Sequence, residues 1–363
     1  MKAKTPQTLR FCRSTDGVQI AYATIGQGPP LVRAAHFLTH LEFDLVSPVW
    51  LPWLRELSNR RQLVRYDARG CGLSDMDSAP QTLDAWVADL EAVVDAAGLE
   101  RFALLGCSQG CAVSIAYAVR HPERVSCLVV LGGYLRGPMR RDPTPSQIKE
   151  AKLMVDLIEL GWGRDNPAFR QVFTSQFIPD GSPEQVQWFN ELERLSTSPA
   201  HAARVIAAFG QIDVTEMAAQ ISCPTLVLHA RGDARVPFEE GRRTAGMISG
   251  ARFVPLDSRS HALLADEPAF AQCFGEIQAF LDEHQAQACP SLAFPDLSPG
   301  ERALLELLAH GLDNLQIAAH LGLAEKTVRN KVSAVFVKLD AATRAQAIVR
   351  AREAGFGAQS LPR

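Results

Sequence analysis

The residues Gly106-Cys107-Ser108-Gln109-Gly110 constrain the fold of this chain more than any other part of its sequence. They lie between an apolar run, Phe102–Leu105, and a stretch with helical spacing, Ala112–Val119. A serine with a glycine two positions away on either side is typical of a strained turn from a strand into a helix, because the glycines let the two backbones approach closely. The motif therefore predicts a strand-turn-helix unit with the serine at the turn.

The same alternation of short apolar runs and helical segments extends over residues 17–130, which predicts a parallel sheet with crossover helices. The candidate strands are Leu31–Ala35, Gln62–Tyr66, Phe102–Leu105, Val125–Leu131, Thr225–His229 and Arg252–Leu256. Residues of about 134–215 have a helical pattern broken by prolines and glycines, which favours a helical lid over a pocket. The lid aromatics indicate either an apolar substrate or a lid core: Trp162, Phe169, Phe173, Phe177, Trp188 and Phe189.

Two further residues complete a catalytic pattern with Ser108. A serine hydroxyl needs a base to become a nucleophile, and that base needs an acid to orient it. On a sheet of this kind the expected chain order is serine, acid, histidine. Asp233 follows the strand Thr225–His229, and His261 follows the strand Arg252–Leu256. Ser108, Asp233 and His261 are therefore the candidate catalytic residues.

With the loop Asp67-Ala68-Arg69-Gly70-Cys71-Gly72-Leu73-Ser74, these motifs resemble the α/β-hydrolase superfamily over residues 10–285. In that loop Asp67 and Arg69 are interpreted as structural. The resemblance implies an oxyanion hole made by the backbone N–H groups of Gln109 and Phe37. It also implies a glycine after the loop histidine, but Phe37 follows His36 here, so we expect a hole of altered shape.

The carboxyl-terminal residues predict a second, all-helical module. Ser298-Pro299-Gly300-Glu301 is a capping box that opens one helix, and shorter helices are expected from about Asn314, Glu325 and Thr343. In the third helix, Val328, Val332 and Val335 share one face, so Lys326, Arg329, Asn330 and Ser333 face outward. Arg329 and Asn330 can each make two hydrogen bonds to the edge of a base. Lys326, Thr327 and Lys331 are better placed to contact phosphates.

The stretch from Leu297 to Gly355 resembles the LuxR/NarL type of helix-turn-helix domain over its full length. The residues that carry the resemblance are Glu301, the Gly311–Asn314 turn, Ile317-Ala318, Leu321-Gly322-Leu323 and Lys326-Thr327-Val328. Two positions depart from the family pattern, because Ala324 replaces a Ser or Thr N-cap and Lys331 replaces a frequent histidine. The resemblance implies binding to double-stranded DNA, with the helix Thr343–Ala354 as a candidate dimer contact. The apolar face of that helix, Ala345, Ile348 and Val349, could equally cover the domain core.

Charge and cysteine usage limit the other possibilities. The net charge is −3, but residues 290–363 carry nine Lys or Arg against seven Asp or Glu. The eight cysteines form no CxxC pair or zinc-finger pattern, so we expect no metal and no cofactor. The amino-terminal residues have no apolar segment typical of a signal peptide, and no run is long enough to span a bilayer. We therefore expect a cytoplasmic protein without membrane contact.

The expected organisation is an α/β-hydrolase-like domain at 1–285, a linker at 286–296 and a LuxR-type helix-turn-helix domain at 297–363. The leading hypothesis is a DNA-binding transcriptional regulator whose first domain senses a small apolar ligand and, in one version, also hydrolyses it. The alternative is a serine esterase in which the helix-turn-helix is an accessory domain. Homodimerisation is expected for either form.

Overall fold

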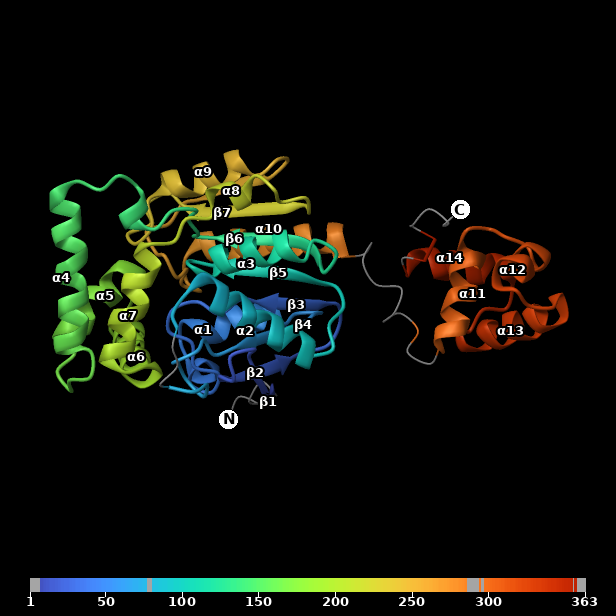
Figure 1. Ribbon diagram of the computed structural model, residues 1–363, viewed down its shortest axis with the longest axis horizontal. Helices are drawn as coiled ribbons and strands as arrows, with labels where there is room; N and C mark the ends of the chain where they lie inside the picture. Colours follow the sequence, from blue (N-terminus) through green and yellow to red (C-terminus); the bar gives the residue numbers. More distant parts are fainter. Residues whose placement is uncertain (1–6, 77–79, 286–293, 295–296, 355, 358–363) are drawn as a thin grey trace. The chain divides into compact units, whose positions relative to one another are not determined.

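A computed structural model describes residues 7–76, 80–285, 294, 297–354 and 356–357 of the chain (Figure 1). The chain divides into two compact units, residues 1–281 and 282–363. The predicted linker 286–296 lies outside the described residues, apart from Phe294. No helix in the described ranges is long and apolar enough to cross a membrane.

The larger unit is built on one eight-stranded sheet with the strand order β1-β2-β4-β3-β5-β6-β7-β8. Its strands are β1 (Gln7–Arg13), β2 (Gln19–Ile25), β3 (Pro30–Arg33), β4 (Gln62–Tyr66), β5 (Phe102–Cys107), β6 (Val125–Leu131), β7 (Thr225–Ala230) and β8 (Arg252–Leu256). The pairs β1–β2 and β2–β4 are antiparallel, and every pair from β4 to β8 is parallel. Parallel neighbours need crossover connections, and helices supply them.

Each central strand contributes to two separate hydrophobic cores, one on either face of the sheet. In β5, Ala103, Leu105 and Cys107 belong to one core, and Phe102 and Leu104 belong to the other. This follows from the two-residue period of a strand, which turns alternate side chains to opposite faces. The first core also includes residues of α1 (Trp50–Leu57) and α10 (Pro268–Gln285). The second packs against α2 (Leu83–Ala96), α3 (Gly110–Arg120), the short α8 (Thr215–Ala218) and α9 (Phe238–Met247).

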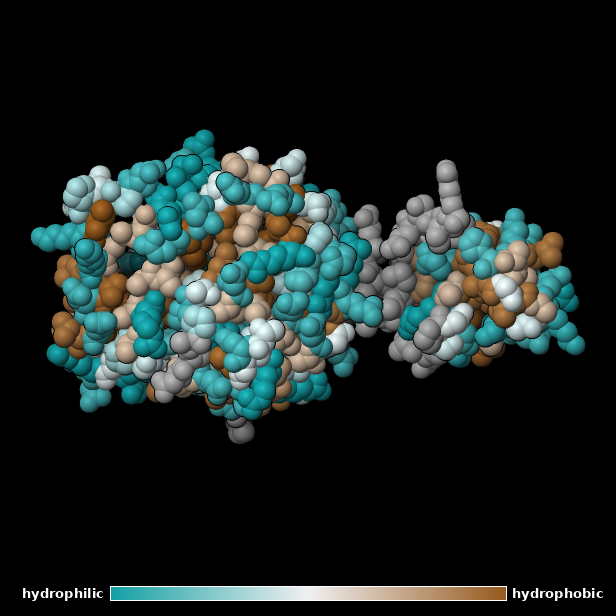
Figure 2. Space-filling view, viewed as in Figure 1, coloured by the Kyte–Doolittle hydropathy of each residue, from teal (hydrophilic) through white to brown (hydrophobic). Residues whose placement is uncertain are grey.

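The segment between β6 and β7 holds a group of helices that lie together beside the sheet (Figure 1). They are α4 (Pro145–Gly161), α5 (Ala168–Phe177), α6 (Pro183–Ser196) and α7 (Pro199–Gly210). Thr144, Ser182 and Ser198 cap the first turns of α4, α6 and α7 through their side-chain oxygens. Figure 2 shows hydrophobic residues scattered over this helical group, which carries exposed apolar side chains such as Leu153 and Leu160.

The smaller unit consists of α11 (Pro299–Ala309), α12 (Asn314–Leu321), α13 (Glu325–Lys338) and α14 (Arg344–Glu353). Their apolar faces form a third core that includes Leu304, Ile317, Val328 and Ala347. Gly322 ends α12 in the left-handed conformation, with φ of 64°, which a glycine adopts without steric cost. The tight turn between α12 and α13 that the sequence predicts is therefore present.

The predicted fold class, a mostly parallel sheet with a helical insertion followed by a four-helix module, is confirmed. Two details differ. The strand predicted at Leu31–Ala35 ends at Arg33, although the Ala34 N–H still donates to the Leu105 carbonyl oxygen of β5. The antiparallel pair β1–β2 was not predicted, because β1 is an edge strand with mixed, partly exposed side chains and no continuous apolar run.

Candidate functional site

Ser108 lies at the turn between β5 and α3 in a strained backbone conformation. Its φ is 55°, in the left-handed region that non-glycine residues rarely adopt. The flanking glycines make this turn possible. A Cβ atom at Gly106 would lie 2.6 Å from the Cα of Cys111, and one at Gly110 would lie 3.0 Å from the Ala35 carbonyl oxygen. The sequence motif therefore has the physical cause that we inferred for it.

Asp233 and His261, which are 28 residues apart in sequence, meet at the ends of β7 and β8. His261 Nδ1 is 2.8 Å from Asp233 Oδ2, and both side chains are almost fully buried. The other carboxylate oxygen, Oδ1, accepts the backbone N–H groups of Arg235 and Val236, at 2.8 Å each. Because a carboxylate only accepts, His261 Nδ1 carries the proton of this hydrogen bond.

Burial by itself would raise the pKa of the Asp233 carboxyl. The charge of His261 and its hydrogen bond more than offset burial, so the pKa of Asp233 lies below its ordinary value. Asp233 is therefore ionised at neutral pH and can stabilise a proton taken up by His261. His261 Nε2 is buried and has no hydrogen-bond partner among the described residues.

Ser108 and His261 approach the same point of the backbone, the start of the loop after β6. The Ser108 N–H donates to the carbonyl oxygen of Leu131 at 3.0 Å. A Cβ atom on the next residue, Gly132, would lie 3.3 Å from His261 Cε1 and 3.7 Å from Asp233 Oδ2. The fold thus gathers Ser108, His261 and Asp233 around Gly132, a residue that the sequence motifs did not single out.

The two residues expected to form an oxyanion hole also lie near each other. Gly110 packs against the backbone of Ala34 and Ala35, which brings the loop after β3 close to the turn that carries Ser108. Phe37 and Gln109 line one pocket. No acceptor in the described part of the chain takes the backbone N–H of Phe37 or of Gln109. Both groups therefore have the free donor that an oxyanion hole requires.

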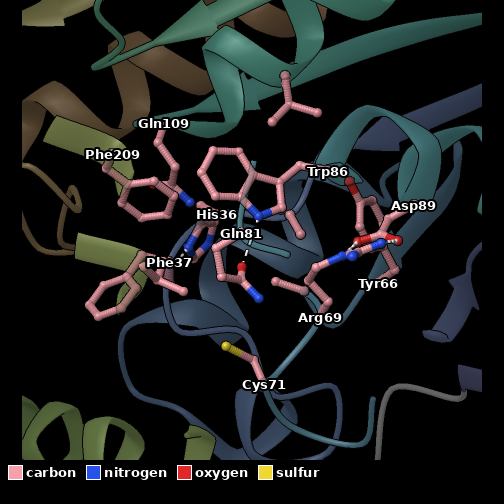
Figure 3. A pocket seen from close by; sticks show the side chains of 14 residues that line it. His36, Phe37, Tyr66, Arg69, Cys71, Gln81, Trp86, Asp89, Gln109 and Phe209 are labelled. Carbon is pink, nitrogen blue, oxygen red and sulfur yellow. Dashed lines mark hydrogen bonds and ion pairs between the residues drawn. The ribbon is translucent and has the colours of Figure 1, made fainter. Parts of the chain in front are cut away.

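The pocket that contains these two residues is narrow, with a cavity volume of about 30 Å³ (Figure 3). Its walls are largely apolar and come from α2, α3, α7 and the loops after β3 and β4. They include Tyr66, Trp86, Val113, Val205 and Phe209. Trp86 and Phe209 meet edge to face, with ring centroids 5.1 Å apart. The mostly apolar lining and few polar groups are typical of a small-molecule site.

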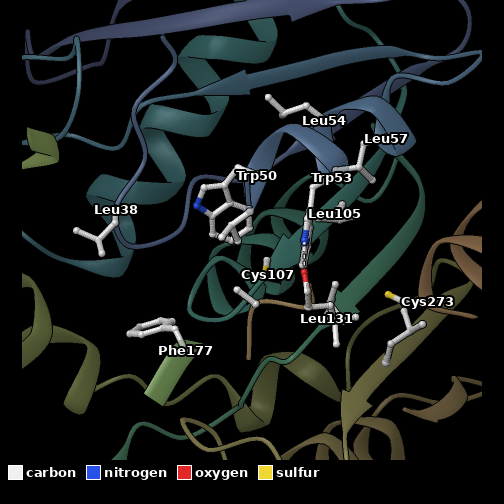
Figure 4. Close-up of a cluster of buried hydrophobic side chains, with 14 of the residues drawn as sticks. Leu38, Trp50, Trp53, Leu54, Leu57, Leu105, Cys107, Leu131, Phe177 and Cys273 are labelled. Atoms are coloured by element: carbon white, nitrogen blue, oxygen red, sulfur yellow. Dashed lines mark hydrogen bonds between the residues drawn. The ribbon is translucent and has the colours of Figure 1, made fainter. Parts of the chain in front are cut away.

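The walls of the pocket are not marked by any sequence motif. Val205 and Phe209 lie in α7 and approach Trp86 of α2 only through tertiary packing, so no local motif marks them. The lid aromatics that we weighed as substrate contacts are mostly buried in a hydrophobic core instead, including Trp162, Phe173, Phe177 and Phe189. Figure 4 shows Phe177 in this core, to the left of Cys107 and Leu131 in the view.

The end of lid helix α5 is attached to the loop that carries His261. The carbonyl oxygen of Phe177 accepts the backbone N–H groups of His261, at 2.8 Å, and Ala262, at 3.0 Å. The Phe177 ring meets the His261 ring edge to face. Gln176, the residue before Phe177, accepts a hydrogen bond of 2.8 Å at Oε1 from the guanidinium of Arg235. Arg235 lies two residues after Asp233. The lid therefore contacts both the acid loop and the histidine loop.

The predicted DNA-contacting residues lie on one helix, α13. Lys326, Thr327, Arg329, Asn330 and Ser333 are exposed and Lys331 is half-buried, while Val328, Val332 and Val335 are buried beneath them. Two of these residues make local contacts, because Arg329 pairs with Glu325 at 3.0 Å and the Ser333 hydroxyl donates to the Arg329 carbonyl. Lys338, at the end of the same helix, instead pairs with Glu301 of α11.

Neither unit contains a recognisable metal site in its described residues, since no cluster of three or more His, Cys, Asp or Glu side chains is arranged to hold an ion. The seven described cysteines are free thiols. Burial raises the pKa of the Cys107 thiol, next to Ser108, to about 12. Cys107 is thus protonated at neutral pH and unsuited to act as a nucleophile in place of the serine.

Comparison with known proteins identifies the family of each unit. Residues 43–268 match the family model of the alpha/beta hydrolase fold, and residues 295–351 match that of bacterial regulatory proteins of the luxR family. The AB hydrolase superfamily protein YisY of Bacillus subtilis is 28% identical over 263 residues, which cover 71% of this chain and 94% of YisY. Pyrrolizixenacetamide deacetylase of Xenorhabdus hominickii is 28% identical over 238 residues, 66% of this chain and 86% of the deacetylase.

Among solved structures, an esterase from Exiguobacterium antarcticum aligns with a TM-score of 0.66 at 21% identity and covers 76% of this chain and all of the esterase. At that identity the likeness concerns the fold alone. The hydrolase-family match spans well over half of the chain, and the luxR-family match coincides with the four-helix unit. The chain therefore belongs to the α/β hydrolase family and carries a carboxyl-terminal helix-turn-helix domain of the luxR family of bacterial regulatory proteins.

Proposed function

We propose that this chain is a DNA-binding transcriptional regulator whose hydrolase-like domain senses, and can hydrolyse, a small-molecule ligand. The proposal rests most on α13, where polar and basic side chains face outward over a buried valine row within a luxR-family domain. A helix of this kind, preceded by a short helix and a tight turn, suits the major groove of DNA. The ligand site is the pocket lined by Phe37, Trp86, Gln109 and Phe209.

The proposed hydrolysis uses Ser108, His261 and Asp233. His261 Nε2 takes the Ser108 hydroxyl proton as Oγ bonds to an ester carbonyl carbon, and the N–H groups of Phe37 and Gln109 stabilise the oxyanion. The bond to the alcohol oxygen then breaks, and the alcohol leaves with the proton from His261. Water attacks the acyl-enzyme in the same way, which releases the acid and restores Ser108.

DNA binding is tested with the full chain and a duplex selected from a random pool. We expect affinity to fall steeply with salt, because phosphate contacts release counterions. Arg329→Ala should weaken binding, and Lys326→Ala should also reduce the slope of log K against log salt by about 1. Arg242→Ala is the matched control, since Arg242 is an exposed arginine paired with Glu239 in the hydrolase unit. Equal affinity for all four proteins would remove α13 from the DNA interface.

A second candidate function is a serine esterase for which the luxR-family domain is an accessory. The 2.8 Å contact between His261 and Asp233 favours it, because a regulator that only binds a ligand does not need an oriented base. A panel of p-nitrophenyl esters and a fluorophosphonate probe test this function in the full chain. Turnover and labelling that both disappear in Ser108→Ala would support it, and absence of both in the parent chain would exclude it.

A further inference from the structure

His36 is a buried polar side chain in the wall of the pocket, and the proposed hydrolysis does not use it. It lies in the loop after β3, directly before Phe37, and is 5% exposed. Figure 3 shows its ring among the labelled side chains of the pocket, which include Phe37 and Gln109. Most polar atoms buried this deeply have a hydrogen-bond partner, so a ring nitrogen without one needs an explanation.

One nitrogen of the ring is held in place and identifies the tautomer. Nδ1 lies 2.6 Å from the carbonyl oxygen of Phe37, which can only accept a hydrogen bond. The proton is therefore on Nδ1. One face of the imidazole also packs against Trp50, with ring centroids 4.9 Å apart, and a ring flip would break the Nδ1 hydrogen bond.

The other nitrogen, Nε2, has no partner among the described residues. Burial, and after it the charge of Arg33, lowers the pKa of His36 to about 3, so the ring is neutral throughout the physiological range. A neutral imidazole that is protonated on Nδ1 carries a lone pair on Nε2. The neutral His36 ring, which forms part of the pocket wall, therefore has a buried acceptor on Nε2 and no positive charge.

The charged groups of the pocket do not offer a site for an anion. Arg69 is the cation in the lining, and its guanidinium binds Asp89 at 2.7 and 2.6 Å and Asp16 at 2.7 Å. Two carboxylates therefore surround one cation, which leaves this end of the pocket with excess negative charge. A ligand carboxylate would be repelled both by that negative charge and by the lone pair of His36.

We infer that His36 selects ligands that are uncharged and largely apolar but carry a hydroxyl or N–H group to donate to Nε2. The aromatic and aliphatic walls take the body of such a molecule, and the single acceptor fixes its orientation. This inference rests on the proposed role of the pocket as the ligand site. It goes further by naming the chemical class, which excludes carboxylates and pure hydrocarbons.

The test compares two probes that differ by one methyl group, 4-propylphenol, which can donate, and 4-propylanisole, which cannot. Calorimetric titration of the full chain should show the phenol binding about fivefold more tightly, the effect of one net hydrogen bond. His36→Phe should bind the phenol as weakly as the anisole while its affinity for the anisole stays within about twofold. His40→Phe is the matched control, because His40 lies in the same loop but not in the pocket wall, and it should keep the preference.

The outcomes separate the ligand class from the pocket itself. Equal affinity of the parent chain for both probes would overturn the inference and leave the pocket as a ligand site. Binding of neither probe would overturn the pocket assignment as well. If His36→Phe does not fold, ¹⁵N NMR of the parent chain decides the question. A shift of the His36 Nε2 resonance with the phenol but not with the anisole supports the inference, and bound phenol without that shift overturns it.

Discussion

Asp67 is a buried carboxyl that holds the loop after β4 in shape. Its Oδ2 accepts the backbone N–H groups of Leu73, at 2.8 Å, and Leu41, at 3.2 Å. Gly72 has φ of 57°, and a Cβ atom there would lie 2.2 Å from that oxygen, so the close packing requires glycine. The interpretation of Asp67 as structural agrees with these contacts, and the loop in turn supports the pocket wall at Cys71.

Protonation of Asp67 makes the stability of the hydrolase unit depend on pH. Burial raises the pKa of this carboxyl from 3.8 to about 7, despite the two N–H donors. The unfolded chain loses the proton near pH 4, whereas the folded chain keeps it until about pH 7. Between these values the native state binds more protons, so the free energy of unfolding falls as pH rises.

We predict that Asp67→Asn removes this component of the pH dependence. The Asn amide oxygen can still accept both N–H groups but has no charge to bury. Between pH 5 and 7 the variant should gain stability over the parent chain, by up to about 1.4 kcal/mol per pH unit. Urea unfolding of the hydrolase unit at several pH values measures the effect. Asp75→Asn, an exposed position in the same loop, serves as control, and parallel pH profiles of parent and Asp67→Asn would contradict the prediction.

At the scale of elements, the end of α5 holds the loops that carry the catalytic candidates. The backbone bonds from His261 and Ala262 to Phe177 are joined by the side-chain bond between Gln176 and Arg235. The negative end of the helix dipole also lies at Phe177, which favours positive charge on His261 during proton transfer. The end of α5 therefore helps to hold Asp233 and His261, the candidate acid and base, in place.

We expect Gln176→Leu to lower the rate of Ser108 modification by a fluorophosphonate about tenfold, because a displaced acid loop misaligns His261. Asp180→Asn is the matched control. It removes an exposed ion pair between the lid and Arg259, and such pairs contribute little. Labelling rates that are equal in the two variants would show that the contact between Gln176 and Arg235 does not position the catalytic loops.

The start of α13 lacks a side-chain cap. Ala324 occupies the N-cap position with φ of −71° and ψ of 143°, and no side chain there accepts the N–H groups of the first turn. We predict that Ala324→Ser stabilises the four-helix unit by about 1 kcal/mol, because the hydroxyl can accept one of those N–H groups. Thermal unfolding of the full chain, followed at the transition of this unit, measures the gain. Ala342→Ser, at an exposed position just before the Thr343 cap, should change little, and an equal gain there would refute a capping effect.

Elements with a strong local signal were predictable from the sequence, and contacts between distant elements were not. Gly106 and Gly110 mark the Ser108 turn because backbone strain requires them at that spacing, and capping residues such as Ser298 mark helix starts. The bonds of Phe177 to His261 join segments more than 80 residues apart, and the pocket wall at Phe209 depends on how α7 packs against α2. No periodic pattern or motif in the sequence marks either of these contacts.

At the scale of the whole molecule, the proposed function requires the pocket in residues 1–281 to influence the helix-turn-helix in residues 282–363. A ligand can do this only if it favours one arrangement of the two units over another. The resulting coupling is reciprocal, so an occupant that changes DNA affinity must itself bind more or less tightly when DNA is present. This requirement holds for a ligand that is only sensed and for one that is hydrolysed.

We predict that permanent occupation of the site changes DNA affinity at least about fivefold, the lower end of common coupling energies. A fluorophosphonate carrying an alkyl chain is expected to bond covalently to Ser108, next to Gln109 of the pocket lining, which avoids the need to know the natural ligand. DNA affinity of the labelled full chain is compared with that of the untreated chain and of Ser108→Ala exposed to the same reagent. Unchanged affinity after complete labelling, with Ser108→Ala also unchanged, would show that the hydrolase unit does not control DNA binding through this site. The esterase with an accessory luxR-family domain would then be the better description of the chain.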